Sequence, residues 1–108
     1  MRGEALKGHL ELILLASLQS GPAYGYALIQ HLRQRTGGQL DLTEGTVYPA
    51  LHRLEEAGYL SSQMQTVDSR RRRLYAITRL GEAELERLRR EWAQFVNGIQ
   101  NLLATDRE

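Results

Sequence analysis

The N-terminal third of the chain contains two apolar stripes of helical period, each followed by a glycine break. Over residues 9–19 apolar side chains recur at spacings of three and four, which predicts a helix. This helix is apolar around most of its circumference, so we expect it at the centre of the core. Its stripe consists of Leu10, Ile13, Leu14 and Leu18, widened by Leu12 and Leu15. Beyond Ser20-Gly21-Pro22, a second helix over residues 24–35 is expected to bury Leu28, Ile29 and Leu32.

A third helix is predicted from about residue 44, and a proline lies inside it. Thr43 is placed as its N-cap, and the pair Ala57-Gly58 ends it. Pro49 removes a backbone donor, which costs about 3 kcal/mol in a helix interior but little in a first turn. Pro49 therefore lies either in the second turn or in the first turn of a helix that begins near Thr46. The alternative is that it only fixes a bend for core packing. The apolar stripe of this helix consists of Val47, Leu51 and Leu54.

After Gly58 the pattern changes to alternation. Residues 59–66 and 72–77 can each place successive side chains on opposite faces, and residues 67–70 between them have turn composition. This predicts a β-hairpin. Thr78 then fits the N-cap of a last helix over residues 79–103. The fold class is therefore mainly α with a small β-hairpin: a winged helix-turn-helix domain over residues 1–78, with a long dimerisation helix over residues 79–108.

The last helix has a narrow apolar seam. Its members are spaced 3, 4, 3, 4 and 3 residues apart, as at the a and d positions of a coiled coil. We expect this seam to pair with a second copy of the chain about a two-fold axis. The alternative is that the helix folds back on its own domain, with Leu80, Val96 and Leu103 contributing. The predicted interface consists of Leu85, Leu88, Trp92, Phe95, Ile99 and Leu102.

Trp92 and Phe95 on this seam have two interpretations. They could be packing residues of the interface, which is the ordinary role of large aromatic side chains there. They could also line a flat slot that accepts a small planar aromatic effector by stacking.

Composition excludes several classes of protein. A chain of 108 residues with 42% hydrophobic and 25% charged residues is ordinary for a single globular domain. It has no cysteine, and its three histidines lack a metal-ligand spacing. The sequence contains no catalytic nucleophile, triad or phosphate-binding glycine loop, so no enzyme and no cofactor is expected. The apolar run over residues 10–18 is too short to cross a membrane, and no signal pattern precedes it, so we expect a cytoplasmic protein.

The distribution of charge favours a nucleic-acid binder. The net charge is only +1, yet four consecutive arginines, Arg70, Arg71, Arg72 and Arg73, fall at the tip and return strand of the hairpin. A hairpin wing needs phosphate contacts there. The start of the third helix offers free amides and short hydroxyls to phosphates and base edges. The residues expected to face outward there are Thr43, Gly45, Thr46 and Tyr48.

Three segments resemble, in order, the motifs of the PadR family of transcriptional regulators: "LKGHLELILLASLQSGPAYGYALIQHL", "EGTVYPALHRLEEAGYL" and "RRRRLYAITRLGEAEL". The Tyr-Pro pair in the second makes the resemblance specific, and the likeness is to short members with one C-terminal dimerisation helix. At the wing, Ser69 stands before the arginines, where the family commonly has glycine. Early in the second helix, Tyr24 precedes the family's Gly-Tyr pair.

The resemblance implies a homodimeric repressor on double-stranded operator DNA, with the third helix as recognition helix. The resemblance also implies which residues face DNA: Thr46, Tyr48, Pro49, His52 and Arg53, together with Glu44 of the same block. It implies that the four arginines make the contacts of the wing. A tryptophan on the last helix is similar to that of drug-responsive members. The alternative function is a winged-helix dimer that acts as a protein–protein adaptor, which would not need the arginines.

Overall fold

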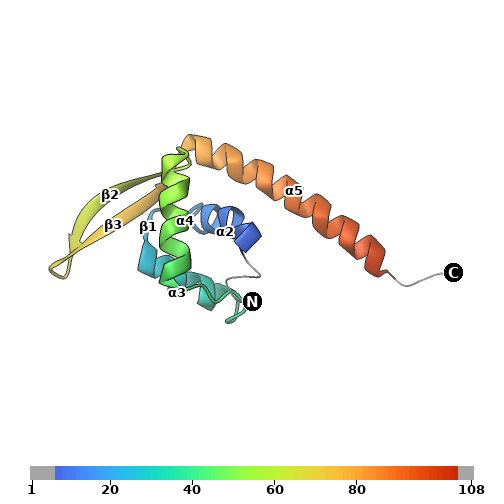
Figure 1. Ribbon diagram of the computed structural model, residues 1–108, viewed down its shortest axis with the longest axis horizontal. Helices are drawn as coiled ribbons and strands as arrows, with labels where there is room; N and C mark the ends of the chain where they lie inside the picture. The colour runs from blue at the N-terminus through green and yellow to red at the C-terminus, as the bar shows by residue number, and fades with distance from the viewer. Residues whose placement is uncertain (1–6, 105–108) are drawn as a thin grey trace.

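Three helices pack around one leucine-rich core in the computed structural model, which describes residues 7–104 (Figure 1). They are α2 (Leu10–Ser17), preceded by the 3-10 turn η1 (Lys7–His9), α3 (Gly25–Arg35) and α4 (Glu44–Glu56). The α2 helix ends two residues before the predicted end, and Ser17 Oγ donates a hydrogen bond back to the Ile13 carbonyl at 2.7 Å. The fully buried side chains are Leu14, Leu15, Leu18, Leu28, Leu42, Val47 and Leu51.

The predicted hairpin is present, but it belongs to a sheet of three strands. β2 (Leu60–Val67) and β3 (Arg70–Ile77) pair antiparallel, and β1 (Ala23–Tyr24) pairs with the other edge of β3. The hairpin prediction is confirmed, and β1 is an additional strand that the sequence did not predict, because two residues are too few to show any alternation. β3 also begins two residues earlier than predicted. Asp68 and Ser69 alone form the turn, with φ of 51° and 65°, as a two-residue hairpin with this twist requires.

The α4 helix begins at Glu44, so Pro49 lies in its second turn. The Thr43 carbonyl accepts the amides of Thr46 and Val47 at 3.1 and 3.0 Å, but the Thr43 side chain caps no amide and donates instead to Thr46 Oγ1 at 3.3 Å. Thr43 therefore occupies the predicted N-cap position, but its side chain makes no capping hydrogen bond. The amides of Glu44 and Gly45, which precede Thr46 and Val47, have no acceptor within the helix, which leaves them for an external acceptor.

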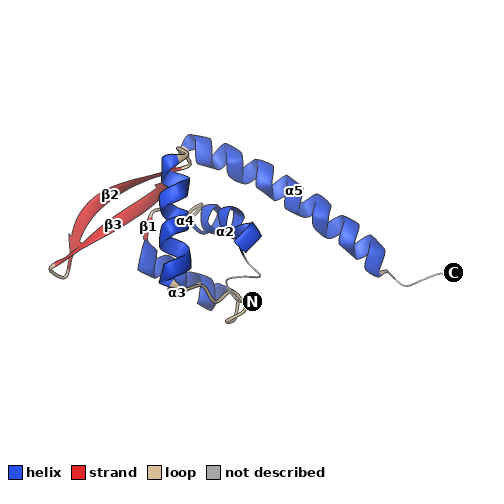
Figure 2. Ribbon diagram, viewed as in Figure 1, coloured by secondary structure: helices blue, strands red, loops and turns tan. Residues whose placement is uncertain are grey.

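The α5 helix (Arg79–Leu103) leaves the body of the molecule (Figure 2). Thr78 caps it as predicted, because its Oγ1 accepts the Gly81 amide at 3.0 Å while it donates to the Gly58 carbonyl at 2.6 Å. Gly81 packs so tightly that a Cβ there would overlap the Tyr59 carbonyl oxygen. The start of α5 is thus fixed to the end of α4, whereas its C-terminal half extends to one end of a molecule 64 Å long.

Candidate nucleic-acid interface

One face of α4 is exposed along its whole length. Gly45, Pro49, His52 and Glu56 follow each other at spacings of four, three and four, which places them in one stripe, and all are exposed. His52 Nε2 lies 3.5 Å from Glu56 Oε2 within this stripe. The predicted residues Thr43 and Glu44 are exposed at the helix start, beside the unpartnered amides, and Thr46 is half-buried. This face is free to approach a nucleic acid.

Tyr48 lies at the edge of this stripe and is held against α3. A Cβ on Gly25 would lie only 2.5 Å from Tyr48 Cε1, so the ring is seated on the glycine backbone. The side chain remains 36% exposed. Burial raises the pKa of the Tyr48 hydroxyl, Glu44 raises it further, and Arg72 opposes both effects. Tyr48 is therefore a neutral donor of fixed position, less free than the sequence suggested.

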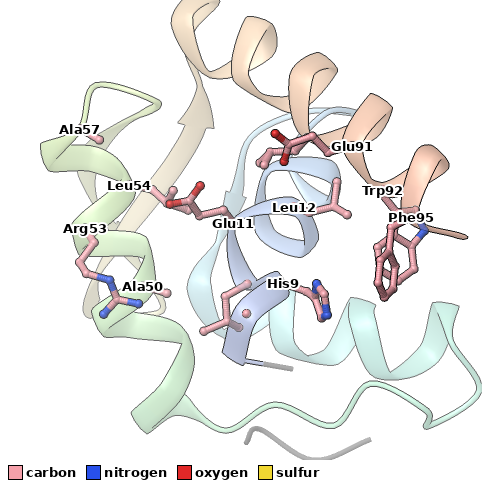
Figure 3. Close-up of a pocket in the computed structure, with 13 residues that line it drawn as sticks. His9, Glu11, Leu12, Ala50, Arg53, Leu54, Ala57, Glu91, Trp92 and Phe95 are labelled. Carbon is pink, nitrogen blue, oxygen red and sulfur yellow. The ribbon is translucent and has the colours of Figure 1, made fainter. Parts of the chain in front are cut away.

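Arg53 is separated from that stripe. It lines a cleft bounded by α2, α4 and α5, with Ala50 and Leu54 of its own helix (Figure 3). Its position on α4 is about 100° around the helix axis from His52. The structure thus brings most of the predicted α4 residues to one face and turns Arg53 towards the cleft.

The four arginines of the wing do not act as one group. Side chains alternate along a strand, so Arg70 and Arg72 share one face of β3, and Arg71 and Arg73 share the other. The Arg72 guanidinium lies over the Tyr26 ring, 4.5 Å from its centroid. Neither Arg70 nor Arg71 has an ion-pair partner within residues 7–104. These two side chains at the tip are the free cations of the wing.

Arg73 joins the wing to α4 through a short hydrogen-bond chain. Arg73 Nη1 donates to Ser62 Oγ at 3.0 Å, and Ser62 Oγ donates to Glu55 Oε2 at 2.7 Å. Burial raises the pKa of the nearby Tyr75 hydroxyl, and Glu55 raises it further. Glu55, which looks by sequence like an ordinary solvated glutamate, therefore connects α4 to the sheet.

The cleft has a volume of about 580 Å³. The Trp92 indole is in edge contact with the His9 ring at 5.3 Å, and it is tilted on Phe95 at 5.7 Å. Both aromatic side chains project from α5 beside the start of α2 (Figure 3). Two carboxylates, Glu11 and Glu91, also line the cleft.

The predicted seam of α5 divides into two parts. Leu85 is only 3% exposed and belongs to the core of its own domain, and Leu88 is partly buried against that core. These two residues therefore support the fold-back alternative for the first turns of the helix. Beyond them the seam is uncovered: exposure is 42% for Trp92, 56% for Phe95, 37% for Ile99 and 80% for Leu102.

Two other kinds of feature are absent from the part of the chain that the structure describes. Residues 7–104 contain no group of three histidine, aspartate or glutamate side chains arranged to hold a metal ion. Within the same range, no helix combines the length and apolarity that crossing a membrane requires.

Comparison with known proteins agrees with this geometry. The sequence model of the Transcriptional regulator PadR-like family matches residues 14–87. The chain is 38% identical over 101 residues to the transcriptional regulator Rv3488 of Mycobacterium tuberculosis, covering 91% of this chain and 92% of that one. A transcriptional regulator from Clostridium thermocellum superposes with a TM-score of 0.86 at 29% identity, covering 94% and 99% of the two chains.

A PadR family regulator from Eggerthella lenta superposes with a TM-score of 0.83 at 32% identity, covering 95% of this chain and 88% of that one. These relatives are regulators of transcription and not enzymes, and they share the winged-helix architecture predicted from the sequence. The family match spans α2 to the first turns of α5, including α4 and the wing. This chain belongs to the PadR-like family of DNA-binding transcriptional regulators.

Proposed function

We propose that the protein is a homodimeric repressor that binds a pseudo-palindromic operator through α4 and the wing. The observation that carries this proposal is the position of the exposed α4 stripe beside the wing, whose Arg70 and Arg71 are free. The stripe suits base edges in the major groove, and the arginines suit phosphates. In this proposal residues 1–78 form the DNA-binding domain and residues 79–108 the dimerisation helix.

Dimerisation is supported by the uncovered part of α5. Apolar side chains of this size on one helix face are normally covered in a folded protein. A second copy is the simplest partner, because a two-fold axis lets the same stripe cover itself. Two α4 helices in one dimer then address half-sites about one helical turn apart.

The cleft supports release by a small planar aromatic compound. Trp92 and Phe95 offer stacking surfaces to a planar aromatic ring. The charges of the cleft are mixed, because Glu11 and Glu91 share it with Arg53 and Glu91 is paired with Arg87. Because the cleft is bounded by both α4 and α5, an occupant would change the angle between the recognition and dimerisation helices. Release would follow from that change in angle.

The test is operator preference measured by fluorescence anisotropy. The duplex from upstream of the protein's own gene is compared with a random duplex of equal length at one fixed salt concentration. We expect a clear preference, and we expect His52→Ala to reduce it by about 1–3 kcal/mol for each base edge that the variant no longer binds. Gln100→Ala, an exposed change on α5, is the matched control. Equal binding of both duplexes by the unmodified protein would reject the operator and favour the adaptor alternative.

The effector is tested by tryptophan fluorescence. Trp92 is the only tryptophan of the chain, so any change reports on the cleft. Acridine orange should quench the indole and compete with operator binding, and Trp92→Leu should abolish the competition. Quenching by neither acridine orange nor a neutral naphthol would remove the effector from the proposal and leave the repressor intact.

A further inference from the structure

The first residues of α3 lie between the wing and the recognition helix. Tyr24 and Tyr26 face the same way, because their rings stack with centroids 5.9 Å apart and an interplanar angle of 12°. We call these two residues the tyrosine pair. Tyr24 belongs to β1 and Tyr26 to the first turn of α3, so the pair spans a strand-to-helix junction.

Each ring of the tyrosine pair holds a different strand of the wing. Tyr24 Oη donates a hydrogen bond to Gln65 Oε1 of β2 at 2.7 Å. The Arg72 guanidinium of β3 covers the Tyr26 ring at 4.5 Å. Gln65 and Arg72 are directly opposite each other in the hairpin register, two pairs from the Val67–Arg70 pair that closes the turn. The tyrosine pair therefore contacts both strands at one register position of the hairpin, close to the wing tip.

The glycine between the two tyrosines contacts the recognition helix. The Tyr48 ring packs directly on the Gly25 backbone, and a side chain at this position would overlap the ring. Arg72 lowers the pKa of the Tyr48 hydroxyl and Tyr26 raises it, each less than burial does. Three consecutive residues thus contact both elements that face DNA.

We propose that the segment Tyr24-Gly25-Tyr26 sets the orientation of the wing relative to α4, and that Tyr26 is a positioning residue that acts through Arg72. This inference rests on the proposed use of α4 and the wing as the operator-binding surface. One face of the Arg72 guanidinium is covered by the ring, while its N–H edges remain available to a phosphate. Arg72 is therefore preorganised, whereas Arg70 and Arg71 must be ordered when DNA binds.

The size of the effect has an upper limit. A wing released from Tyr26 can still reach the bound orientation. The operator affinity therefore falls only in proportion to the fraction of molecules whose wing already has that orientation. An exposed cation–π contact corresponds to about a threefold change in population, and a dimer with two wings would lose about tenfold in operator affinity. A much larger loss would indicate that Tyr26 itself contacts DNA.

A double-mutant cycle separates the two roles. Operator affinity is measured for the unmodified protein, for Tyr26→Leu, for Arg72→Gln and for the double variant, with Tyr26→Phe as the conservative control. We expect Tyr26→Leu to lose about tenfold and Tyr26→Phe to lose almost nothing, because phenylalanine keeps the ring. In the Arg72→Gln background, Tyr26→Leu should cause no further loss. Additive losses, or no loss in Tyr26→Leu, would overturn the inference.

A second measurement does not depend on DNA. In the free protein, the Tyr26 ring should shift the δ-proton NMR signals of Arg72 upfield in the unmodified protein and in Tyr26→Phe, but not in Tyr26→Leu. Unshifted Arg72 signals in the unmodified protein would also overturn the inference. If that protein shows the shift but prefers no operator, the proposed function fails and the role of Tyr26 in DNA binding fails with it. If it prefers the operator and Tyr26→Leu behaves normally, only this inference fails.

Discussion

Phe95 offers the most direct test of the proposed dimer, because its ring lies on α5 and is 56% exposed. Phe95 and its neighbour Trp92 both line the cleft, but Trp92 also contacts the His9 ring, so truncation of Trp92 would remove a contact between α5 and the rest of its own chain. We therefore choose Phe95→Ala as the perturbation. The variant should fold normally, because the ring contributes to no buried core cluster.

The expected magnitude follows from the exposed area of the ring. A phenylalanine side chain presents about 200 Å² in all, so roughly 110 Å² of Phe95 is available to a partner. At about 25 cal/mol for each Å², burial contributes about 2.8 kcal/mol per chain and about 5.5 kcal/mol per symmetric dimer. Losing that contribution should raise the dimer dissociation constant roughly 10⁴-fold.

Sedimentation velocity over a wide concentration range measures this constant. Leu80→Ala is the matched control, because Leu80 is also 56% exposed on α5 but lies outside the seam, near Gly58. We expect Leu80→Ala to remain as dimeric as the unmodified protein. Circular dichroism establishes that both variants keep their helices. A Phe95→Ala protein that dissociates no more readily than Leu80→Ala would refute the assignment of this stripe to the interface.

Three further predictions concern the fold and the wing. Gly81→Ala should destabilise the protein by about 1–3 kcal/mol in denaturant unfolding, because the new Cβ overlaps the Tyr59 carbonyl oxygen, while Gly98→Ala, which meets nothing within 4 Å, should stabilise it by about 0.5–1 kcal/mol. The opposite order would contradict the packing at the start of α5. Ser69→Gly should raise the free energy of unfolding by about 1 kcal/mol, because glycine adopts the positive φ of 65° without strain, and an unchanged midpoint would show that the turn is not strained. Changing Arg70 and Arg71 together to alanine should make the negative slope of log K against log salt shallower, by about 0.9 for each phosphate that is no longer neutralised, or about 3.6 for a dimer. An unchanged slope would exclude the wing tip from DNA.

The helices and the core could be predicted from the sequence because their period repeats many times. The stripe of Leu10, Leu14 and Leu18, for example, identifies one face whatever that face packs against. Thr78 was also predictable, because an N-cap depends on residues within one turn. β1 was not, because a strand of two residues is defined only by its pairing with β3.

The candidate site was predictable as a set of residues but not as an arrangement. The spacing of the α5 seam is the same whether a partner or the chain's own α2 covers it, so the sequence could not assign Leu85 to the core. Alternation places Arg72 on a face of β3 but does not identify Tyr26 as its neighbour. The turning of Arg53 towards the cleft follows from the way α4 packs, which depends on contacts remote in sequence.

The wing and the exposed end of α5 lie at opposite ends of the molecule's 64 Å length (Figure 1). If α5 pairs as proposed, the crossing of the two helices is a pivot and each domain is a long arm attached to it. Over an arm of this length, a rotation of a few degrees at the pivot moves the wing by a distance comparable with the roughly 3.4 Å rise of one base pair. The crossing angle would therefore fix the accepted distance between half-sites to within about one base pair. A compound in the cleft would need to turn this pivot by only a few degrees to bring the protein out of register with its DNA.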